Sequence, residues 1–313
     1  MEIYKKIWNK IEESNNIVLI SHVNPDGDAL GSSLSMYNIL KNMNKNVTIV
    51  NMTDLAPYLD FLPNYNKVKK QLPKNIDLMI SFDCGSFDRL GIEEKPSFLI
   101  NLDHHISNTN YGDMNLIEEA ASTSQVVFNI LEANNIKIDK DSAVCIYTAL
   151  VTDTGNFQYE SVTSEVFRIA SELVKCGVQP DFISKMLYER DRLSRLRFLA
   201  KALDTLELNL EGKVGIVEVT SELMQKTGAV KDDTDGLVNM VRKLATVEVA
   251  VMLREEENGD IKISLRSKNY VDVSKVAVKY GGGGHIRASG ATIKDKSFSE
   301  IKEMLLNDIK EEL

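Results

Sequence analysis

The sequence predicts an α/β protein with an N-terminal domain, built on a mostly parallel sheet flanked by helices, and a smaller C-terminal α/β domain. Short apolar runs recur through the first half without alternation, as in parallel strands buried on both faces. Helical periodicities separate these runs, and from residue 206 onward the segments alternate like half-exposed strands. The length of 313 residues fits about two domains of roughly 150 residues each.

Four strands are expected in the N-terminal domain, at 17–22, 47–50, 77–82 and 97–102. An amphipathic helix precedes the first strand. A second helix is expected to begin near Asp28, because Leu30, Leu34 and Tyr37 recur at helical spacing. Further helical periodicities cover 122–134, 140–151, 163–175 and 180–205. Strands and helices that alternate in this way form βα units, which fit a parallel sheet.

The C-terminal half combines alternating segments with fewer helices. The alternating segments are LELNL, KVGIVEV, TVEVAVML and DIKISLRS. A helix-like segment, DDTDGLVNMVRKL, lies among them, and an amphipathic helix is expected from residue 298. We therefore expect one domain at 1–190, a connector helix at 191–205 and a second domain at 206–313.

Charge and composition exclude several classes of function. The chain has 37 Lys and Arg against 46 Asp and Glu, a formal net charge of -9, which argues against a broad basic surface for long nucleic acid. The 3 cysteines include no closely spaced pair, which favours a reducing compartment. The N-terminal stretch resembles no signal peptide, and no apolar run reaches membrane-spanning length. The expectation is a cytoplasmic protein that engages no membrane.

The first candidate site cluster is His22-x-x-x-Asp26-x-Asp28, at the carboxyl end of a predicted strand. Pro25 and Gly27 favour a tight loop that turns several side chains toward one point. Imidazole and carboxylate ligands suit Mn²⁺, Fe²⁺, Co²⁺ or Mg²⁺. The alternative is a solvated turn in which Asp28 caps the next helix and no metal is bound.

Three further acidic or histidine positions end predicted elements. Asp83 follows the third strand, Asp103, His104 and His105 follow the fourth, and Asp153 follows a helix. Ligands of open α/β sheets bind beyond the carboxyl ends of the strands, so these side chains are expected to meet. Without cations the crowded carboxylates would repel one another, and this repulsion favours a metal centre.

A glycine-rich run in the C-terminal half suggests an anion site. Gly281–Gly284 would expose backbone N–H groups, and His285, Arg287 and Ser289 follow. Arg266 ends a predicted strand, and its guanidinium suits a phosphate or a base. The alternative interpretations are a flexible hinge and a solvated arginine.

These motifs together resemble those of a known superfamily over almost the whole chain. HVNPDGDALGSS, SFDCGS, LDHH and VTDTGNF resemble the four motifs of the DHH phosphoesterases, and GGGGHIRASG resembles the glycine-rich motif of their DHHA1 domain. The resemblance is strongest to bacterial nanoRNase (oligoribonuclease)/pAp phosphatases. It implies hydrolysis of very short oligoribonucleotides to mononucleotides, and of 3'-phosphoadenosine 5'-phosphate (pAp) to AMP. Rival interpretations are a cyclic di-AMP or pApA phosphodiesterase, an inorganic pyrophosphatase, and a catalytically silent nucleotide sensor.

The resemblance also implies a role for each residue of the site. It implies two divalent cations, usually manganese, with Mg²⁺, Co²⁺ or Fe²⁺ as alternatives. One ion would be held by His22 and Asp26, the other by Asp28, His104 and Asp153, with Asp83 bridging them. His105 would contact the scissile phosphate and assist proton transfer, and Asp103 would orient the histidines. The substrate, a short RNA or small nucleotide, would be held by Arg266, Ser267, Gly283, Gly284, His285, Arg287 and Ser289. Whether the chain forms a homodimer is left open.

Overall fold

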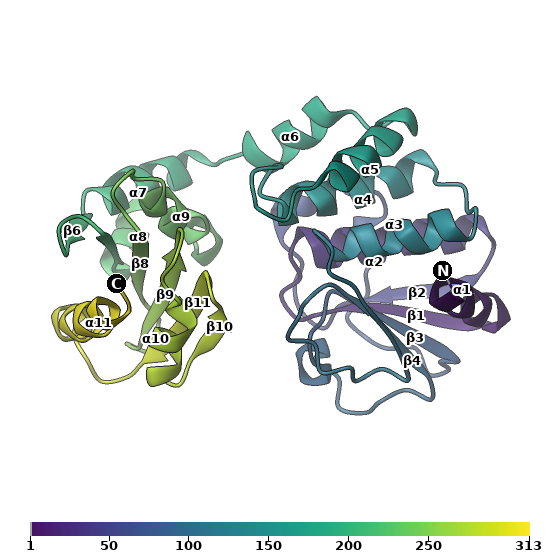
Figure 1. Cartoon of the computed structure of the whole chain (residues 1–313), viewed down its shortest axis with the longest axis horizontal. Helices are drawn as coiled ribbons and strands as arrows, with labels where there is room; N and C mark the ends of the chain where they lie inside the picture. The colour runs from purple at the N-terminus through teal and green to yellow at the C-terminus, as the bar shows by residue number, and fades with distance from the viewer. Residues whose placement is uncertain (1) are drawn as a thin grey trace. The chain divides into compact units, whose positions relative to one another are not determined.

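The computed structural model describes residues 2–313 and confirms the α/β class. The chain divides into two compact units (Figure 1). The first unit ends at Arg190, and the second comprises Asp191–Leu313. Each unit has its own sheet and its own buried apolar core. No helix within residues 2–313 is both long enough and apolar enough to cross a bilayer.

The first unit is built on a parallel sheet with the strand order β2-β1-β3-β4-β5. The strands are β1 (Asn16–Ser21), β2 (Asn46–Val50), β3 (Leu78–Phe82), β4 (Leu99–Asp103) and β5 (Met114–Ile117). The four expected strands are confirmed. Every residue of β3 and β4 is buried, which explains their uninterrupted apolar sequences. The edge strand β5 escaped prediction because its MNLI sequence is short and mostly half-buried.

Helices cover this sheet in layers. They are α1 (Glu2–Glu13), α2 (Gly27–Asn42), α3 (Thr123–Ala133), α4 (Lys140–Asp153), α5 (Ser164–Lys175) and α6 (Pro180–Tyr188). Figure 1 shows α2 and α3 over one face of the sheet, with α4 and α5 stacked beyond them. Gly31 lets α2 approach α4 closely, because a Cβ there would lie 2.6 Å from the carbonyl oxygen of Cys145. Short 3₁₀ helices lie at Pro57–Leu59, Tyr65–Lys67 and Phe87–Leu90.

The second unit carries a mixed sheet with the order β10-β11-β9-β8-β7-β6. Its strands are β6 (Glu207–Asn209), β7 (Val214–Val219), β8 (Val249–Glu255), β9 (Ile261–Ser267), β10 (Gly283–His285) and β11 (Ala288–Ile293). Only β7 and β8 pair in parallel among these strands of the described chain. The helices are α7 (Leu193–Leu203), α8 (Ser221–Thr227), α9 (Leu237–Arg242), α10 (Val273–Lys279) and α11 (Phe298–Glu312), with a 3₁₀ turn at Lys231–Thr234.

The helical periodicity over 180–205 belongs to two separate helices. Helix α6 ends at Tyr188, and α7 begins only at Leu193. The intervening residues Glu189–Arg192 are all charged and exposed, so they offer no apolar side chain to continue a buried helix face. Arg192 adopts an extended backbone before α7, which packs against α8 and β7.

Candidate metal centre

Residues that are distant in the sequence meet beyond the carboxyl ends of β1, β3 and β4. These strands are parallel neighbours, so the loops that follow them lie at one edge of the sheet. Among residues 2–313, candidate ligand atoms lie within 4.8 Å of one another in the groups His22–Asp26–Asp83, Asp28–His104–Asp153 and Asp83–His104–His105. The structure therefore brings together all the side chains of the N-terminal half that the sequence singled out as possible metal ligands.

His22 is buried and held in one tautomer by the backbone. Its Nδ1 lies 2.8 Å from the carbonyl oxygen of Val23. A carbonyl oxygen only accepts hydrogen bonds, so Nδ1 carries the proton and Nε2 keeps its lone pair. Nε2 lies 3.7 Å from Asp83 Oδ2. His22 therefore directs a ligand atom toward the carboxylates.

His104 repeats this arrangement. Its Nδ1 lies 3.1 Å from the carbonyl oxygen of Ala120, so Nδ1 is the donor here too. Its Nε2 lies 3.4 Å from Asp153 Oδ2, 3.5 Å from Asp83 Oδ1 and 4.0 Å from Asp28 Oδ2. Histidine ligands of metals characteristically donate their other ring nitrogen to a carbonyl or carboxylate. Both histidines therefore fit a divalent cation.

Asp83 lies between the two histidines. Its Oδ2 is the oxygen near His22, and its Oδ1 is the oxygen near His104. The hydroxyl of Thr123 also donates to Oδ1, at 3.0 Å. Asp83 has a φ of +54°, in the left-handed region that few residues other than Gly, Asn and Asp adopt readily. With this backbone, the two oxygens of the Asp83 carboxylate face different histidines.

Asp26 and Asp28 have different roles at the start of α2. Asp26 is the N-cap, because its Oδ1 accepts hydrogen bonds from the N–H groups of Asp28 and Ala29 at 3.1 and 3.0 Å. The alternative in which Asp28 caps this helix is therefore wrong. The buried Asp28 carboxylate instead accepts hydrogen bonds from the N–H groups of Thr123 and Ser124 at the N-terminus of α3.

Asp103 and His105 form a hydrogen-bonded pair beside the candidate ligands. Asp103 Oδ1 lies 2.7 Å from His105 Nδ1 and accepts the backbone N–H of His104 at 2.9 Å. The Asp103 side chain is fully buried, whereas His105 is part-exposed. The hydrogen bond with Asp103 raises the pKa of His105 to about 9. His105 is therefore a part-exposed imidazole that favours its cationic form.

Burial dominates the electrostatics of the carboxylates. It raises the pKa of Asp153 to about 7. Burial and the negative charge of Asp83 together raise the pKa values of Asp26 and Asp28. Burial opposes ionisation of Asp83 too, but the nearby imidazoles of His22, His105 and His104 lower its pKa. Buried carboxylates that repel one another are stabilised by cations, so the charge distribution fits a metal centre.

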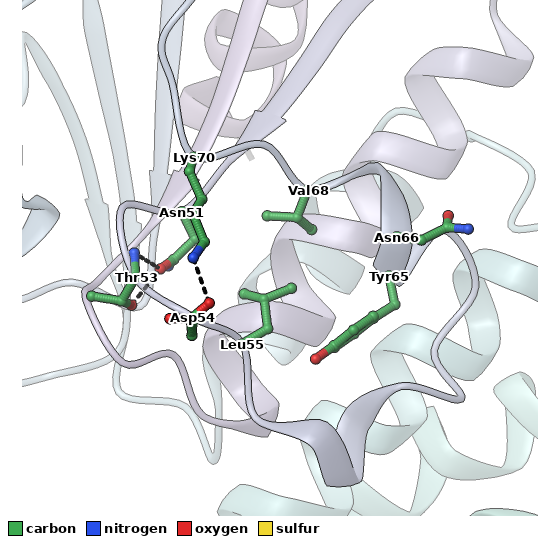
Figure 2. Close-up of a pocket in the computed structure, with 8 residues that line it drawn as sticks. All are labelled: Asn51, Thr53, Asp54, Leu55, Tyr65, Asn66, Val68 and Lys70. Atoms are coloured by element: carbon green, nitrogen blue, oxygen red, sulfur yellow. Dashed lines mark hydrogen bonds and ion pairs between the residues drawn. The ribbon is translucent and has the colours of Figure 1, made fainter.

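Figure 2 shows a pocket lined in part by Asn51 and Thr53, and these two residues also bind the loop that carries His22. Its lining includes Asn51, Thr53, Tyr65 and Lys70. Asn51 Nδ2 donates to the carbonyl oxygen of His22 at 2.8 Å, and the hydroxyl of Thr53 accepts the N–H of Asn24 at 2.7 Å. The wall of this pocket therefore braces the His22 loop from the side of β2. Sequence reasoning missed this contribution, because Asn51 and Thr53 belong to an unremarkable loop.

In the second unit, Arg266 and His285 share one face of the sheet. Ala288 on β11 is paired with Arg266 on β9 and with His285 on β10. Residues directly opposite in antiparallel strands present their side chains on the same face. The small side chain of Ala288 therefore separates an arginine from a histidine on this face. Arg287, the residue before Ala288, donates from Nη1 to the carbonyl oxygen of Val271 at 2.8 Å.

Other residues of the expected cradle have structural partners. Gly281 and Gly282 donate their N–H groups to the carbonyl oxygens of Val278 and Ala277, each at 3.0 Å, and so close the C-terminus of α10. The expectation that these two N–H groups are free is therefore wrong. Gly283 and Gly284 instead form the edge strand β10 with His285. Ser267 and Ser289 are buried in the sheet, and Ser289 Oγ donates to the carbonyl oxygen of Val273 at 2.6 Å.

Comparison with known proteins agrees with this fold and site. A family model described as the DHH family, N-terminal domain, matches residues 16–150, and a model of the DHHA1 domain matches residues 212–312. The bifunctional oligoribonuclease and PAP phosphatase NrnA of Thermus thermophilus is 34% identical, over 95% of this chain and 90% of that protein. The chain therefore belongs to the DHH family of phosphoesterases, which are hydrolases.

More distant proteins share the same architecture. The protein of the same name from Bacillus subtilis is 27% identical, over 89% of this chain and 90% of that protein. An exopolyphosphatase-related protein from Bacteroides fragilis superposes with a TM-score of 0.93 at 28% identity, over 99% of this chain and 96% of that chain. RecJ of Thermus thermophilus, solved in complex with Mn²⁺, matches with a TM-score of 0.56 at 12% identity, over 99% of this chain and 54% of that chain, and shows the fold alone.

Proposed function

We propose that this protein is a divalent-metal-dependent phosphoesterase that hydrolyses very short oligoribonucleotides to mononucleotides and pAp to AMP. The observation that carries the metal assignment is the shared geometry of His22 and His104. Both rings donate Nδ1–H to a backbone carbonyl and direct Nε2 toward buried carboxylates. The substrate assignment is supported by the relatives from Thermus thermophilus and Bacillus subtilis, which are named bifunctional oligoribonuclease and PAP phosphatase.

The ligand groups support a dinuclear centre. His22 and Asp26 would hold one cation, Asp28, His104 and Asp153 would hold the other, and Asp83 would contribute one oxygen to each. When bound, such a pair of cations neutralises phosphate charge and lowers the pKa of a bound water. Imidazole with carboxylate oxygens suits Mn²⁺, Mg²⁺, Co²⁺ and Fe²⁺. The resemblance to other DHH phosphoesterases favours Mn²⁺ among them.

The protein's own side chains would then position the substrate and move protons. Asp103 holds His105 through Nδ1, so the other ring nitrogen of His105 is the one that faces a scissile phosphate. A cationic or donor imidazole at that point stabilises the charge that develops on the phosphate oxygens. Asp103 remains buried and acts by orienting the two neighbouring histidines.

The second unit would hold the nucleotide end of the substrate. Arg266 and His285 supply donors on one face of the sheet, and Arg287, Gly283 and Gly284 adjoin them. Ser267 and Ser289 support this edge from inside the sheet rather than through solvent-facing hydroxyls. In this proposal residues 1–190 carry the chemistry and residues 206–313 bind substrate, while residues 191–205 contribute α7.

The net charge of -9 supports small substrates over long polymers. Partners beyond the nucleotide are not part of the proposal, and the expected cytoplasmic location stays a prediction.

A substrate panel tests this proposal. The purified protein with Mn²⁺ is incubated with RNA of two to five nucleotides, pAp, pApA, cyclic di-AMP and pyrophosphate, and the products are separated by chromatography. Asp83→Asn serves as the inactive control. We expect mononucleotides from the short RNA and AMP from pAp. Preferred turnover of cyclic di-AMP, pApA or pyrophosphate, or no turnover of any substrate, would contradict the proposal.

A further inference from the structure

A line of hydrogen-bonded polar side chains crosses the sheet beneath the candidate metal centre. Tyr111 donates its hydroxyl to Ser81 Oγ at 2.8 Å. Ser81 Oγ lies 3.2 Å from Asn101 Oδ1 and 3.4 Å from the carbonyl oxygen of Ile100. Asn101 Nδ2 then donates to Asn108 Oδ1 at 3.1 Å. Ser81 and Asn101 are fully buried, so the hydrogen bond between them is shielded from water, whereas Tyr111 and Asn108 are half-buried.

The line ends at the Asp103–His105 pair. Asn108 Nδ2 donates to Asp103 Oδ2 and to the carbonyl oxygen of Cys84. The other oxygen of Asp103 lies 2.7 Å from His105 Nδ1. Asn108 thus holds one carboxylate oxygen while His105 binds the other, and the plane of the carboxylate is fixed from both sides.

The direction of every hydrogen bond follows from the backbone partners of Asn108. Its Oδ1 accepts the backbone N–H of Asn110 at 2.7 Å, and its Nδ2 donates to the backbone carbonyl of Cys84 at 3.1 Å. A backbone N–H only donates and a carbonyl only accepts, so the amide cannot be flipped. Asn101 must therefore present Nδ2 to Asn108 and Oδ1 to Ser81. All donors in the line point toward the Asp103 carboxylate.

We propose that Asn108 is a positioning residue that fixes the Asp103 carboxylate and, through it, the ring of His105. This inference rests on the proposed function, because it gives His105 its part in the reaction. Asn108 contacts neither substrate nor cation in this assignment. Without its amide, Asp103 Oδ2 loses a donor inside a fully buried site, and the carboxylate turns to find another. His105 Nδ1 then loses its fixed partner.

The first test compares Asn108→Ala with Asn115→Ala. Asn115, in the neighbouring strand β5, is the control, because its amide also donates two hydrogen bonds but binds only residues 110 and 112. With pAp as substrate and Mn²⁺ present, we expect Asn108→Ala to lower kcat about 10- to 100-fold with little change in KM, as for other residues that orient a functional group. Asn115→Ala should retain kcat within about twofold. Equal losses in both variants, or none in Asn108→Ala, would overturn the proposal.

A second measurement does not depend on turnover. In the Mg²⁺-loaded, ¹⁵N-histidine-labelled protein, NMR reports whether Nδ1 of His105 carries a hydrogen-bonded proton. We expect Nδ1–H in the unsubstituted protein and in Asn115→Ala, and an altered signal in Asn108→Ala. Asn108→Ser, which keeps a short donor, replaces the alanine variant if the latter does not fold. An unchanged His105 signal would overturn the positioning role, whereas absent pAp hydrolysis with a changed signal would count against the proposed function alone.

A double-variant experiment identifies the route of the effect. If Asn108 acts through Asp103, adding Asn108→Ala to Asp103→Asn should lower kcat by less than about twofold more. A full additional loss would show that Asn108 acts independently of Asp103 and would overturn the proposal.

Discussion

Asp28 Oδ2 accepts the backbone N–H of Thr123 at 2.6 Å, although the two residues are 95 positions apart in the sequence. Oδ1 of the same carboxylate accepts the N–H of Ser124 at 3.0 Å and the hydroxyl of Ser32 at 3.0 Å. The negative charge thus lies at the N-terminus of α3, where unpaired N–H groups and the helix dipole favour it. One side chain joins α2 to α3 and also faces the candidate metal centre.

Asp28→Asn should therefore weaken both the fold and the metal centre. The amide keeps the shape but loses the charge, so we expect a loss of about 1.5–3 kcal/mol in the free energy of unfolding. We also expect one bound Mn²⁺ per chain in place of two. Chemical denaturation and metal analysis check these results. The control is Asp139→Asn, because the Asp139 carboxylate also accepts N–H groups of a first helical turn, as the N-cap of α4, and asparagine is an equally good N-cap. Two bound ions in Asp28→Asn would contradict the assignment.

Removal of the metal should make stability fall as pH rises. Burial raises the pKa of Asp153 to about 7 and raises those of Asp26 and Asp28. The folded, metal-free protein then holds more protons than the unfolded chain between the ordinary carboxyl pKa of 3.8 and about 7. The contribution of these carboxylates to stability is therefore greatest below this window and decreases through it.

Melting temperatures of EDTA-treated protein from pH 4 to 8 check this expectation. Mn²⁺ should displace the bound protons, so calorimetric titration near pH 6.5 in buffers of different ionisation enthalpy should show proton release. Metal binding without proton release would contradict the raised pKa values of these carboxylates. A metal-free protein whose stability rises across this pH range would contradict them too.

Glu248 should stabilise the second unit only when it is ionised. Its buried carboxylate accepts the backbone N–H groups of Asn269, Tyr270 and Val271 at 2.8–3.1 Å. Burial opposes ionisation, but these hydrogen bonds prevail and lower the pKa of Glu248 below its ordinary 4.5. Its stabilisation is therefore present above pH 4.5 and is lost as pH falls through the lowered value.

Glu248→Gln should lower the free energy of unfolding by about 1.5–3 kcal/mol at pH 7, and by less as the pH approaches 3. Urea denaturation at the two pH values measures the difference. The exposed Glu257→Gln is the control. A destabilisation by Glu248→Gln that does not depend on pH would show that charge is not the cause.

Two neighbouring glycines should respond differently to alanine. A Cβ at Gly282 would lie 2.1 Å from the carbonyl oxygen of Gly290, whereas a Cβ at Gly283 meets no heavy atom within 4 Å. Gly282→Ala should therefore lower the free energy of unfolding by about 1–3 kcal/mol, because β11 must move away from the new methyl group. Gly283→Ala should leave the melting temperature nearly unchanged and raise KM for pAp. A reversed order of melting temperatures would contradict the described path of this segment.

The sequence predicted the elements whose signals are local. Strands β1 to β4 are continuous apolar runs, and the side chains that follow them had to meet if the sheet is parallel. The cap of α2 could not be assigned, because Asp26 and Asp28 are both suitable residues and only the contact with Thr123 separates them.

Other features depend on contacts that no spacing shows. The edge strand β5 depends on pairing with β4 rather than on its own apolar content. Gly281 and Gly282 look like free anion-binding glycines in the sequence, but the end of α10 takes their N–H groups. Asn108 follows the two histidines closely, yet its role needs Asn101 and Ser81 from two neighbouring strands.

Anomalous diffraction from crystals grown with Mn²⁺ tests the central claim most directly. The account predicts two manganese peaks, one among His22, Asp26 and Asp83 and one among Asp28, His104 and Asp153, with an oxygen of Asp83 bound to each. Asp83→Asn, which preserves the left-handed backbone, should weaken or abolish both peaks. Manganese bound elsewhere on the chain, with these side chains bound only to one another, would contradict it.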